Sequence, residues 1–160
     1  MASVIFMKKI ILILSLILME AGTTRFLFSE ELGPVKPRTP SYSKEEIFEL
    51  WNGNKKGEAL EKLDQWMNAD RKSPEPWVTA AAIAFNDGRY KRCLKMGEKA
   101  LEKSPQSAGA YYWRGRAFEA MSNWLDAANE YNASLLIEPD YSVAKESLAK
   151  VKSHLSEARP

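Results

Sequence analysis

Polar and apolar residues near the C-terminus of this chain recur with the period of an α-helix. Leu148, Val151 and Leu155 are spaced by three and four residues, which places their side chains on one face of a helix. The pattern predicts an amphipathic helix over residues 142–158. Such a helix draws most of its stability from a neighbour that covers its apolar face. The charged residues of this segment fall on the other faces: Lys145, Glu146, Lys150 and Lys152.

Turn-forming residues divide the preceding stretch into helical segments. Ser43–Glu46 matches a capping box, in which the serine hydroxyl accepts a hydrogen bond from a backbone N–H of the first helical turn. Asn52–Asn54 and Asn86–Gly88 contain residues that tolerate the left-handed conformation in which helices commonly end. A third turn runs through Ser122 and Asn123, and we expect Asn123 to be its left-handed residue. These boundaries predict seven helices and no strands.

The predicted helices repeat with a fixed period of 34 residues. A column of small residues, Ala59, Cys93 and Ala127, follows this period with no insertion. A period of this length is typical of proteins built from stacked helical pairs. The third copy is the most regular of three, and the first copy is the least regular. The copies cover about residues 40–73, 74–107 and 108–141.

The third copy resembles the tetratricopeptide repeat (TPR), a pair of antiparallel helices. The family pattern combines a large residue near the start, a small residue at the helix crossing, aromatic residues at fixed offsets and a final proline. The resemblance implies an all-α fold of three stacked TPR helix-turn-helix pairs plus a C-terminal capping helix, a short right-handed α-solenoid with a concave face. The residues of the third copy that match the family pattern are Tyr111, Gly115, Phe118, Ala127, Tyr131 and Pro139.

Arg114 departs from the family pattern, which usually has leucine at this position. Two explanations for an arginine at this position are open. The side chain either extends out of the helix pair towards solvent or contacts the capping helix, for instance near Glu146.

The predicted core contains apolar and small residues on the inward faces of the helices. A single helix pair cannot bury its apolar side, so stacking of the pairs must supply the stability. The column that includes Cys93 is expected where two helices cross closely and only a small side chain fits. The expected core is Leu60, Leu63, Trp66, Trp77, Ala81, Ala84, Cys93, Leu94, Leu101, Tyr111, Gly115, Phe118, Ala127, Tyr131, Leu135 and Leu148.

The N-terminal segment has the layout of an export signal. Lys8 and Lys9 precede an unbroken apolar run from Ile10 to Met19, and ten helical residues span only ~15 Å, half of a bilayer core. We therefore predict a signal peptide over residues 1–29, with an uncleaved N-terminal anchor as the alternative. Residues 30–42 are predicted to be a proline-rich linker. Both alternatives predict an exported protein in the bacterial periplasm or cell envelope, the second one anchored in the inner membrane.

Charge argues against one large class of partner. Residues 1–29 hold three of the 23 basic and one of the 21 acidic residues, which leaves 20 of each in the rest of the chain. Nucleic-acid binding normally needs a basic face. A neutral domain therefore favours a protein partner over a nucleic acid.

The chain has one cysteine and one histidine, which limits its chemistry. Cys93 has no second cysteine to pair with, and together with His154 it supplies too few ligands for a metal site. An enzyme that uses Cys93 or His154 would need an activating base or an orienting carboxylate, and the sequence offers neither at a suitable spacing. We expect no catalytic residue, no metal site and no cofactor.

The resemblance implies that the first helix of each pair lines the concave groove. The corresponding positions in this chain include several aromatic residues, which dominate the energetics of many protein interfaces. Lys44, Glu75, Val78 and Ala82 are at such positions too. The candidate partner-binding residues are Phe48, Trp51, Phe85, Asn86, Tyr112, Arg116 and Glu119.

Some TPR domains bind acidic C-terminal tails through a clamp of Lys, Asn, Asn, Lys and Arg. Lys44 matches the first clamp residue, but Phe48 stands where an asparagine is expected. Thr79 and Ala82 occupy positions that should be polar in such a clamp. We therefore do not expect this ligand class.

Together these features predict a non-enzymatic protein-interaction scaffold or adaptor. It would bind a peptide or helix of a partner protein in the concave TPR groove at the bacterial cell envelope. The alternative is a structural or self-associating spacer, tethered to the membrane through residues 1–28, in an envelope complex.

Overall fold

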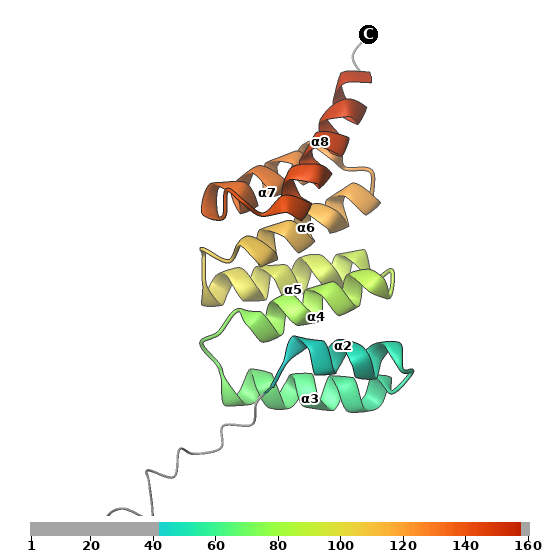
Figure 1. Ribbon diagram of the computed structural model, residues 1–160, viewed down its shortest axis with the longest axis vertical. Helices are drawn as coiled ribbons and strands as arrows, with labels where there is room; N and C mark the ends of the chain where they lie inside the picture. Colours follow the sequence, from blue (N-terminus) through green and yellow to red (C-terminus); the bar gives the residue numbers. More distant parts are fainter. Residues whose placement is uncertain (1–41, 158–160) are drawn as a thin grey trace, which may run out of the picture. The chain divides into compact units, whose positions relative to one another are not determined.

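The computed structural model describes residues 42–157, which form seven α-helices and contain no strand (Figure 1). The predicted signal or anchor segment and most of the linker lie outside the described residues. No helix in this described part is both long and apolar enough to cross a membrane. The helices are α2 (Lys44–Asn52), α3 (Lys56–Ala69), α4 (Glu75–Asn86), α5 (Tyr90–Lys103), α6 (Ala108–Ala120), α7 (Trp124–Ile137) and α8 (Ser142–Glu157).

The helices form three antiparallel pairs that stack in chain order. The pairs are α2 with α3, α4 with α5, and α6 with α7, and α8 packs on α7 at the end of the stack (Figure 1). Helix α4 also contacts α2 and α6, so the first helices of the three pairs are neighbours. This arrangement confirms the predicted all-α solenoid with a C-terminal capping helix.

Local chemistry explains where the helices begin and end. Ser43 caps α2, because its hydroxyl accepts a hydrogen bond from the Glu46 N–H at 3.1 Å. Asn54 (φ 60°) follows α2 and Gly88 (φ 73°) follows α4, and both residues adopt the left-handed conformation. The prediction for the third turn is wrong by one residue, since Ser122 (φ 60°) takes this conformation instead of Asn123.

The core consists of three apolar clusters that each join one pair to the next helices. One cluster joins α2 and α3 to α4, the second joins α4 and α5 to α6, and the third joins α6 and α7 to α8. Eight predicted core residues are buried: Leu63, Ala81, Ala84, Cys93, Gly115, Ala127, Tyr131 and Leu148. Another seven are half-buried: Trp66, Trp77, Leu94, Leu101, Tyr111, Phe118 and Leu135.

Leu60 is the exception, because its side chain is 44% exposed and the core prediction for it is wrong. It lines an open hollow between α3 and the pair α4–α5, next to Trp51 and Arg92. The first and second pairs pack less closely here than the second and third, so an apolar residue on this face of α3 stays in contact with solvent.

Small residues allow the helices of each pair to cross closely. Ala59, Cys93 and Ala127 have no exposed surface, as the period of 34 residues predicts. In the third pair Gly115 lies directly against Tyr131, and a β-carbon at Gly115 would be 2.7 Å from two carbons of that ring. Contacts this short explain why the crossing position has no side chain.

Both explanations considered from the sequence for Arg114 are wrong. Its side chain pairs with α7 instead of extending into solvent or contacting the capping helix. Its guanidinium forms an ion pair with Glu130 on α7, with Nη2 2.9 Å from Oε1. Its aliphatic stem lies over Gly97 on α5, where a β-carbon would be 2.5 Å from Arg114 Cγ. The arginine stem therefore fills the space above a glycine, and the charged end pairs within the third repeat.

Candidate functional site

An open groove runs across the first helices of the three pairs. It encloses about 1150 Å³, open solvent included. Helices α2, α4 and α6 supply most of its walls, and the turn before α8 closes one side. The lining residues are Lys44, Glu45, Phe48, Glu75, Val78, Thr79, Ala82, Gly109, Trp113, Glu138 and Tyr141.

One wall of the groove is apolar because of the helical period of α4. Val78 and Ala82 are four residues apart, so they project from the same face of that helix. Phe48 on α2 and Trp113 on α6 flank this face on either side. Phe48, Val78 and Trp113 are half-buried, which leaves part of each side chain available to a ligand. A partner that covered them would gain hydrophobic contact area.

The polar rim of the groove is acidic. Glu45, Glu75 and Glu138 supply three carboxylates, and Lys44 supplies the single cation among the described residues that line the groove. The Nζ atom of Lys44 lies 3.9 Å from Oε1 of Glu45, and both side chains are exposed. Among the described residues, Glu75 and Glu138 form no ion pair.

Tyr141 lines the groove together with these two carboxylates. Burial raises the pKa of the Tyr141 phenol. The phenol of Tyr112 and the charges of Glu138 and Glu75 raise this pKa further. The ring is also 5.3 Å from the Tyr112 ring, centroid to centroid. An aromatic surface next to two carboxylates is an environment that favours a cation.

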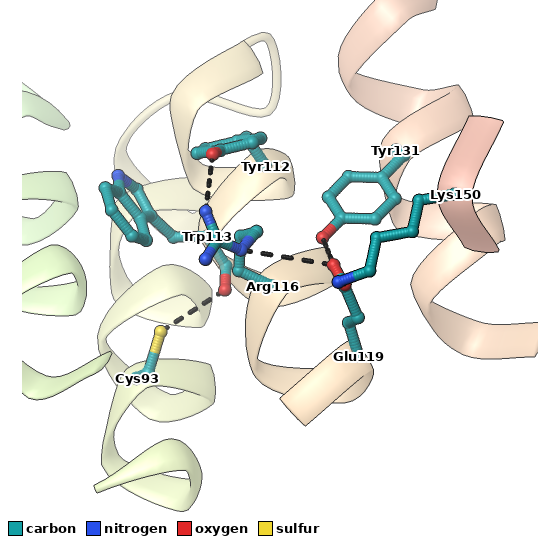
Figure 2. A network of polar contacts seen from close by, with 7 residues as sticks. All are labelled: Cys93, Tyr112, Trp113, Arg116, Glu119, Tyr131 and Lys150. Carbon is teal, nitrogen blue, oxygen red and sulfur yellow. Dashed lines mark hydrogen bonds and ion pairs between the residues drawn. The ribbon is translucent and has the colours of Figure 1, made fainter. Parts of the chain in front are cut away.

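Four of the predicted site residues meet at the other end of α6. The guanidinium of Arg116 lies 4.7 Å from the centroid of the Phe85 ring and 5.9 Å from that of Tyr112. Its Nη1 donates a hydrogen bond of 2.9 Å to the Tyr112 hydroxyl, and its Nε lies 4.0 Å from Glu119 Oε2 (Figure 2). Burial lowers the pKa of Arg116, but the Tyr112 hydrogen bond and the Glu119 charge outweigh burial and raise it overall.

Glu119 connects this cluster to the capping helix. The Tyr131 hydroxyl donates a hydrogen bond of 2.6 Å to Glu119 Oε2, and Lys150 Nζ on α8 donates one of 2.8 Å to Oε1 (Figure 2). Burial raises the pKa of Glu119, whereas the bonds from Lys150 and Tyr131 lower it, and the net pKa lies below its ordinary value. The carboxylate therefore adds a polar contact between the last pair and the capping helix.

The remaining predicted site residues lie elsewhere. Trp51 lines the separate hollow beside α3, where Lys56 Nζ stands 4.7 Å from the centroid of its ring. Asn86 is exposed at the C-terminal end of α4. Of the seven predicted residues, Phe48 lines the large groove, and Tyr112, Arg116 and Glu119 line a second hollow against α8.

Sequence reasoning missed five residues of the groove, which are Glu45, Gly109, Trp113, Glu138 and Tyr141. Trp113 lines it, whereas its predicted neighbour Tyr112 is 6% exposed and packs among aromatic rings. Glu138 and Tyr141 belong to the turn between α7 and α8, outside the first helices that the resemblance points to. They flank Pro139, the final proline of the third copy, and the sequence there carried no signal for the groove.

Cys93 and His154 are both engaged in structural contacts. The Cys93 thiol is buried and donates to the Trp113 carbonyl oxygen at 3.3 Å (Figure 2). Burial raises its pKa to about 12, so the nucleophilic thiolate is not formed near neutral pH. His154 stacks on Trp124 with ring centroids 4.5 Å apart. Residues 42–157 contain no group of three side chains that could hold a metal ion.

Comparison with known proteins gives matches mainly at the level of structure. No protein-family model matches the chain. The chain is 32% identical over 81 residues to a 58 kDa phosphoprotein of Plasmodium berghei. That match covers 51% of this chain and 19% of the relative, so the chain spans about a fifth of the relative's length.

Several solved TPR domains share this arrangement of helices. The first TPR domain of human RPAP3 is 24% identical, with a TM-score of 0.64, and the match covers 71% of this chain and 90% of that one. The Sgt2 TPR domain from Aspergillus fumigatus is 20% identical with a TM-score of 0.64, over 72% of this chain and 78% of that one. The Arabidopsis OM64 TPR domain is 20% identical with a TM-score of 0.62, over 69% and 92%. Residues 42–157 therefore have the fold of a tetratricopeptide-repeat domain, with three helix pairs and a capping helix.

Proposed function

We propose that this protein is a non-enzymatic scaffold that binds a peptide or helix of a partner protein in the groove along α2, α4 and α6. The observation that carries this proposal is the open apolar wall of Phe48, Val78 and Trp113, which no described part of the chain covers. Apolar area left uncovered in a concave site commonly marks a binding surface.

Peptide binding by a structural neighbour supports the proposal. The first TPR domain of Spaghetti (RPAP3), bound to the HSP90 peptide SRMEEVD, is 24% identical to this chain with a TM-score of 0.62. The match covers 71% of this chain and 90% of that one. The neighbour supports a role in peptide recognition, and the groove residues of this chain decide which peptide is bound.

The contacts of the two most reactive side chains support a non-enzymatic role. Cys93 is buried with a raised pKa, and His154 is stacked on Trp124. Neither side chain lines the groove. Binding without chemistry needs only the shape and charge of the groove.

A pull-down with matched variants tests the groove. We propose the double variant Phe48→Ala with Val78→Ser, which removes apolar area from the groove on two different helices. The control is Leu125→Ser with Leu136→Ser on α7, whose side chains are 63% and 85% exposed and lie outside the groove. Circular dichroism of each variant verifies that the helices remain folded.

The full-length chain serves as bait in extracts of the cell envelope. Loss of a captured protein with the groove variant, together with its retention by the control, supports the proposal. Equal capture by the wild type and the groove variant overturns it. Loss only with the α7 control would move the binding surface to the outer face of the third pair.

We also propose that the domain is exported to the periplasm or cell envelope of a bacterium, with residues 1–29 as a signal peptide. The basic pair Lys8–Lys9 and the apolar run Ile10–Met19 support this proposal. The intact mass of the protein from its host tests it. A mass lower by about 20–29 residues indicates a cleaved signal, whereas a full-length mass favours the membrane-tethered spacer. Sedimentation velocity then measures whether the spacer self-associates.

A further inference from the structure

We propose that the partner segment is basic and amphipathic. A lysine or arginine side chain of the partner lies between Glu75 and Glu138 beside the Tyr141 ring, and an adjacent apolar side chain of the partner packs on Phe48 and Trp113. This inference rests on the proposed function, because it specifies which peptide the groove receives.

The groove carries more negative than positive charge among the described residues that line it. Lys44 is near Glu45, so two carboxylates of the groove, Glu75 and Glu138, have no cation of their own among the described residues. Both side chains are exposed, so water solvates them in the free protein. A basic partner would supply the missing positive charge, whereas an acidic partner would meet like charges.

The two carboxylates belong to separate elements of the fold. Glu75 begins α4 and Glu138 follows α7, so they approach the groove from different repeats. Both line the groove together with Tyr141, and the charges of both raise the pKa of its phenol. A guanidinium or ammonium group on the Tyr141 ring would combine a cation–π contact with two carboxylate partners.

Helix electrostatics do not favour a carboxylate at Glu138. It is the C-cap residue of α7, and the last turn of α7 contains no basic residue. A carboxylate at this end of a helix is repelled by the partial negative charge of the exposed carbonyl groups. Glu75, in contrast, lies in the first turn of α4, where a negative charge is stabilised. Glu138 thus has a position that ligand binding explains and helix stability does not.

Two cations at the other end of α6 and on α8, outside the groove, already have partners. Arg116 is engaged by Tyr112 and Glu119, and Lys150 is engaged by Glu119. An acidic tail that paired with Arg116 or Lys150 would have to compete with these contacts. The arrangement therefore disfavours acidic peptides of the kind bound by the neighbour with SRMEEVD.

A selection from random peptides tests the proposal. Phage-displayed random 12-residue peptides are selected on the full-length chain, and the enriched sequences are synthesised for affinity measurements. We expect enrichment of lysine and arginine next to an apolar residue. The affinity should fall with increasing salt, because exposed charge pairs are screened.

Two double variants separate the outcomes. Glu75→Gln with Glu138→Gln should weaken the binding of the selected peptides about two- to thirtyfold, the effect of losing two exposed charge pairs. The matched control, Glu61→Gln with Glu98→Gln, changes two exposed carboxylates outside the groove and should leave the affinity unchanged. Equal affinity for the wild type and the Glu75/Glu138 variant overturns the inference.

Failure of this inference differs from failure of the proposed function. Selected peptides that are acidic or uncharged, and that lose affinity with Phe48→Ala, would overturn the basic partner and retain the groove. Peptides whose binding is insensitive to Phe48→Ala and Val78→Ser would overturn the groove as the binding site.

The predicted linker of this chain also contains two basic residues, Lys36 and Arg38. Tighter peptide binding by a Lys36→Glu, Arg38→Glu variant would assign the groove to this chain's own linker and overturn a separate partner.

Discussion

Arg114 on α6 fills the space above Gly97 on α5, two positions that each depart from the repeat pattern. Gly97 stands in the column that holds Tyr131 in the third copy, and Arg114 stands where leucine is usual. The stem of the arginine replaces the missing bulk, and its charged end pairs with Glu130. The two departures therefore compensate for each other across the boundary between the second and third pairs.

This compensation predicts that Gly97→Ala destabilises the protein. The new β-carbon would lie 2.5 Å from Arg114 Cγ, and we expect a loss of about 1–2 kcal/mol after the helix-propensity gain of alanine is included. Urea unfolding measures the change. In an Arg114→Ala background the same substitution should cost much less, because the clash is gone. A neutral Gly97→Ala in the wild-type background would contradict the packing described.

A second prediction compares two helical glycines. Gly115→Ala should cost about 1–3 kcal/mol, because its β-carbon would lie 2.7 Å from the fully buried ring of Tyr131. Gly57→Ala is the matched control, since no atom lies within 4 Å of the added carbon. Alanine at Gly57 should stabilise α3 by about 0.5–1 kcal/mol. Thermal unfolding of both variants gives the two signs, and equal effects would be inconsistent with the close crossing.

The Cys93 thiol is predicted to be unreactive in the folded protein. It has no exposed surface, and burial raises its pKa to about 12. Iodoacetamide should modify it slowly in native buffer and readily in concentrated urea, with mass spectrometry as the readout. Rapid modification of the native protein would reopen a chemical role for this residue.

Glu119 should make the stability of the fold depend on pH. Its pKa is lowered in the folded state, so its contribution is present above the unfolded-state pKa of about 4.3 and is lost as the pH falls through the folded-state pKa. Urea unfolding of the wild type and Glu119→Gln should differ most at neutral pH. The difference should shrink below about pH 4. A constant difference across this range would exclude the ionised carboxylate as the source.

Glu138 offers a prediction in which stability and binding change in opposite directions. Glu138→Gln removes a carboxylate from the C-terminal end of α7 and should stabilise the free protein by about 0.3–1 kcal/mol at low salt. The gain should disappear in about 1 M salt. A basic peptide should bind this variant more weakly than the wild type. A loss of stability would instead assign Glu138 a structural role.

Much of the fold was predictable because the same residue pattern recurs in three copies, and each copy indicates the same helix pair. The period of 34 residues and the column Ala59, Cys93 and Ala127 predicted the helix crossings, which are fully buried. The errors occur where the repeat is broken. Leu60 belongs to the irregular first copy, and the pair Arg114–Glu130 depends on Gly97, a residue in another repeat.

The candidate site was less predictable than the fold. The repeat pattern identified the helices that line the groove, and Phe48 lies there. It could not distinguish Tyr112 from Trp113, because the packing of the rings between neighbouring helices decides which of the two faces the groove. Glu138 and Tyr141 lie in a turn whose path depends on how α8 packs, and no local pattern encodes that path.

The open hollow beside Leu60 separates the first pair from the rest of the stack more than any other boundary between pairs. Helices α2 and α3 should therefore detach as a unit before global unfolding, and their amide hydrogens should exchange faster than those of α5 or α6. The groove spans this boundary, because Phe48 belongs to the first pair and Val78 to the second. A ligand seated there would slow exchange in α2 and α3, so occupancy of the groove and cooperativity of the array are thermodynamically linked.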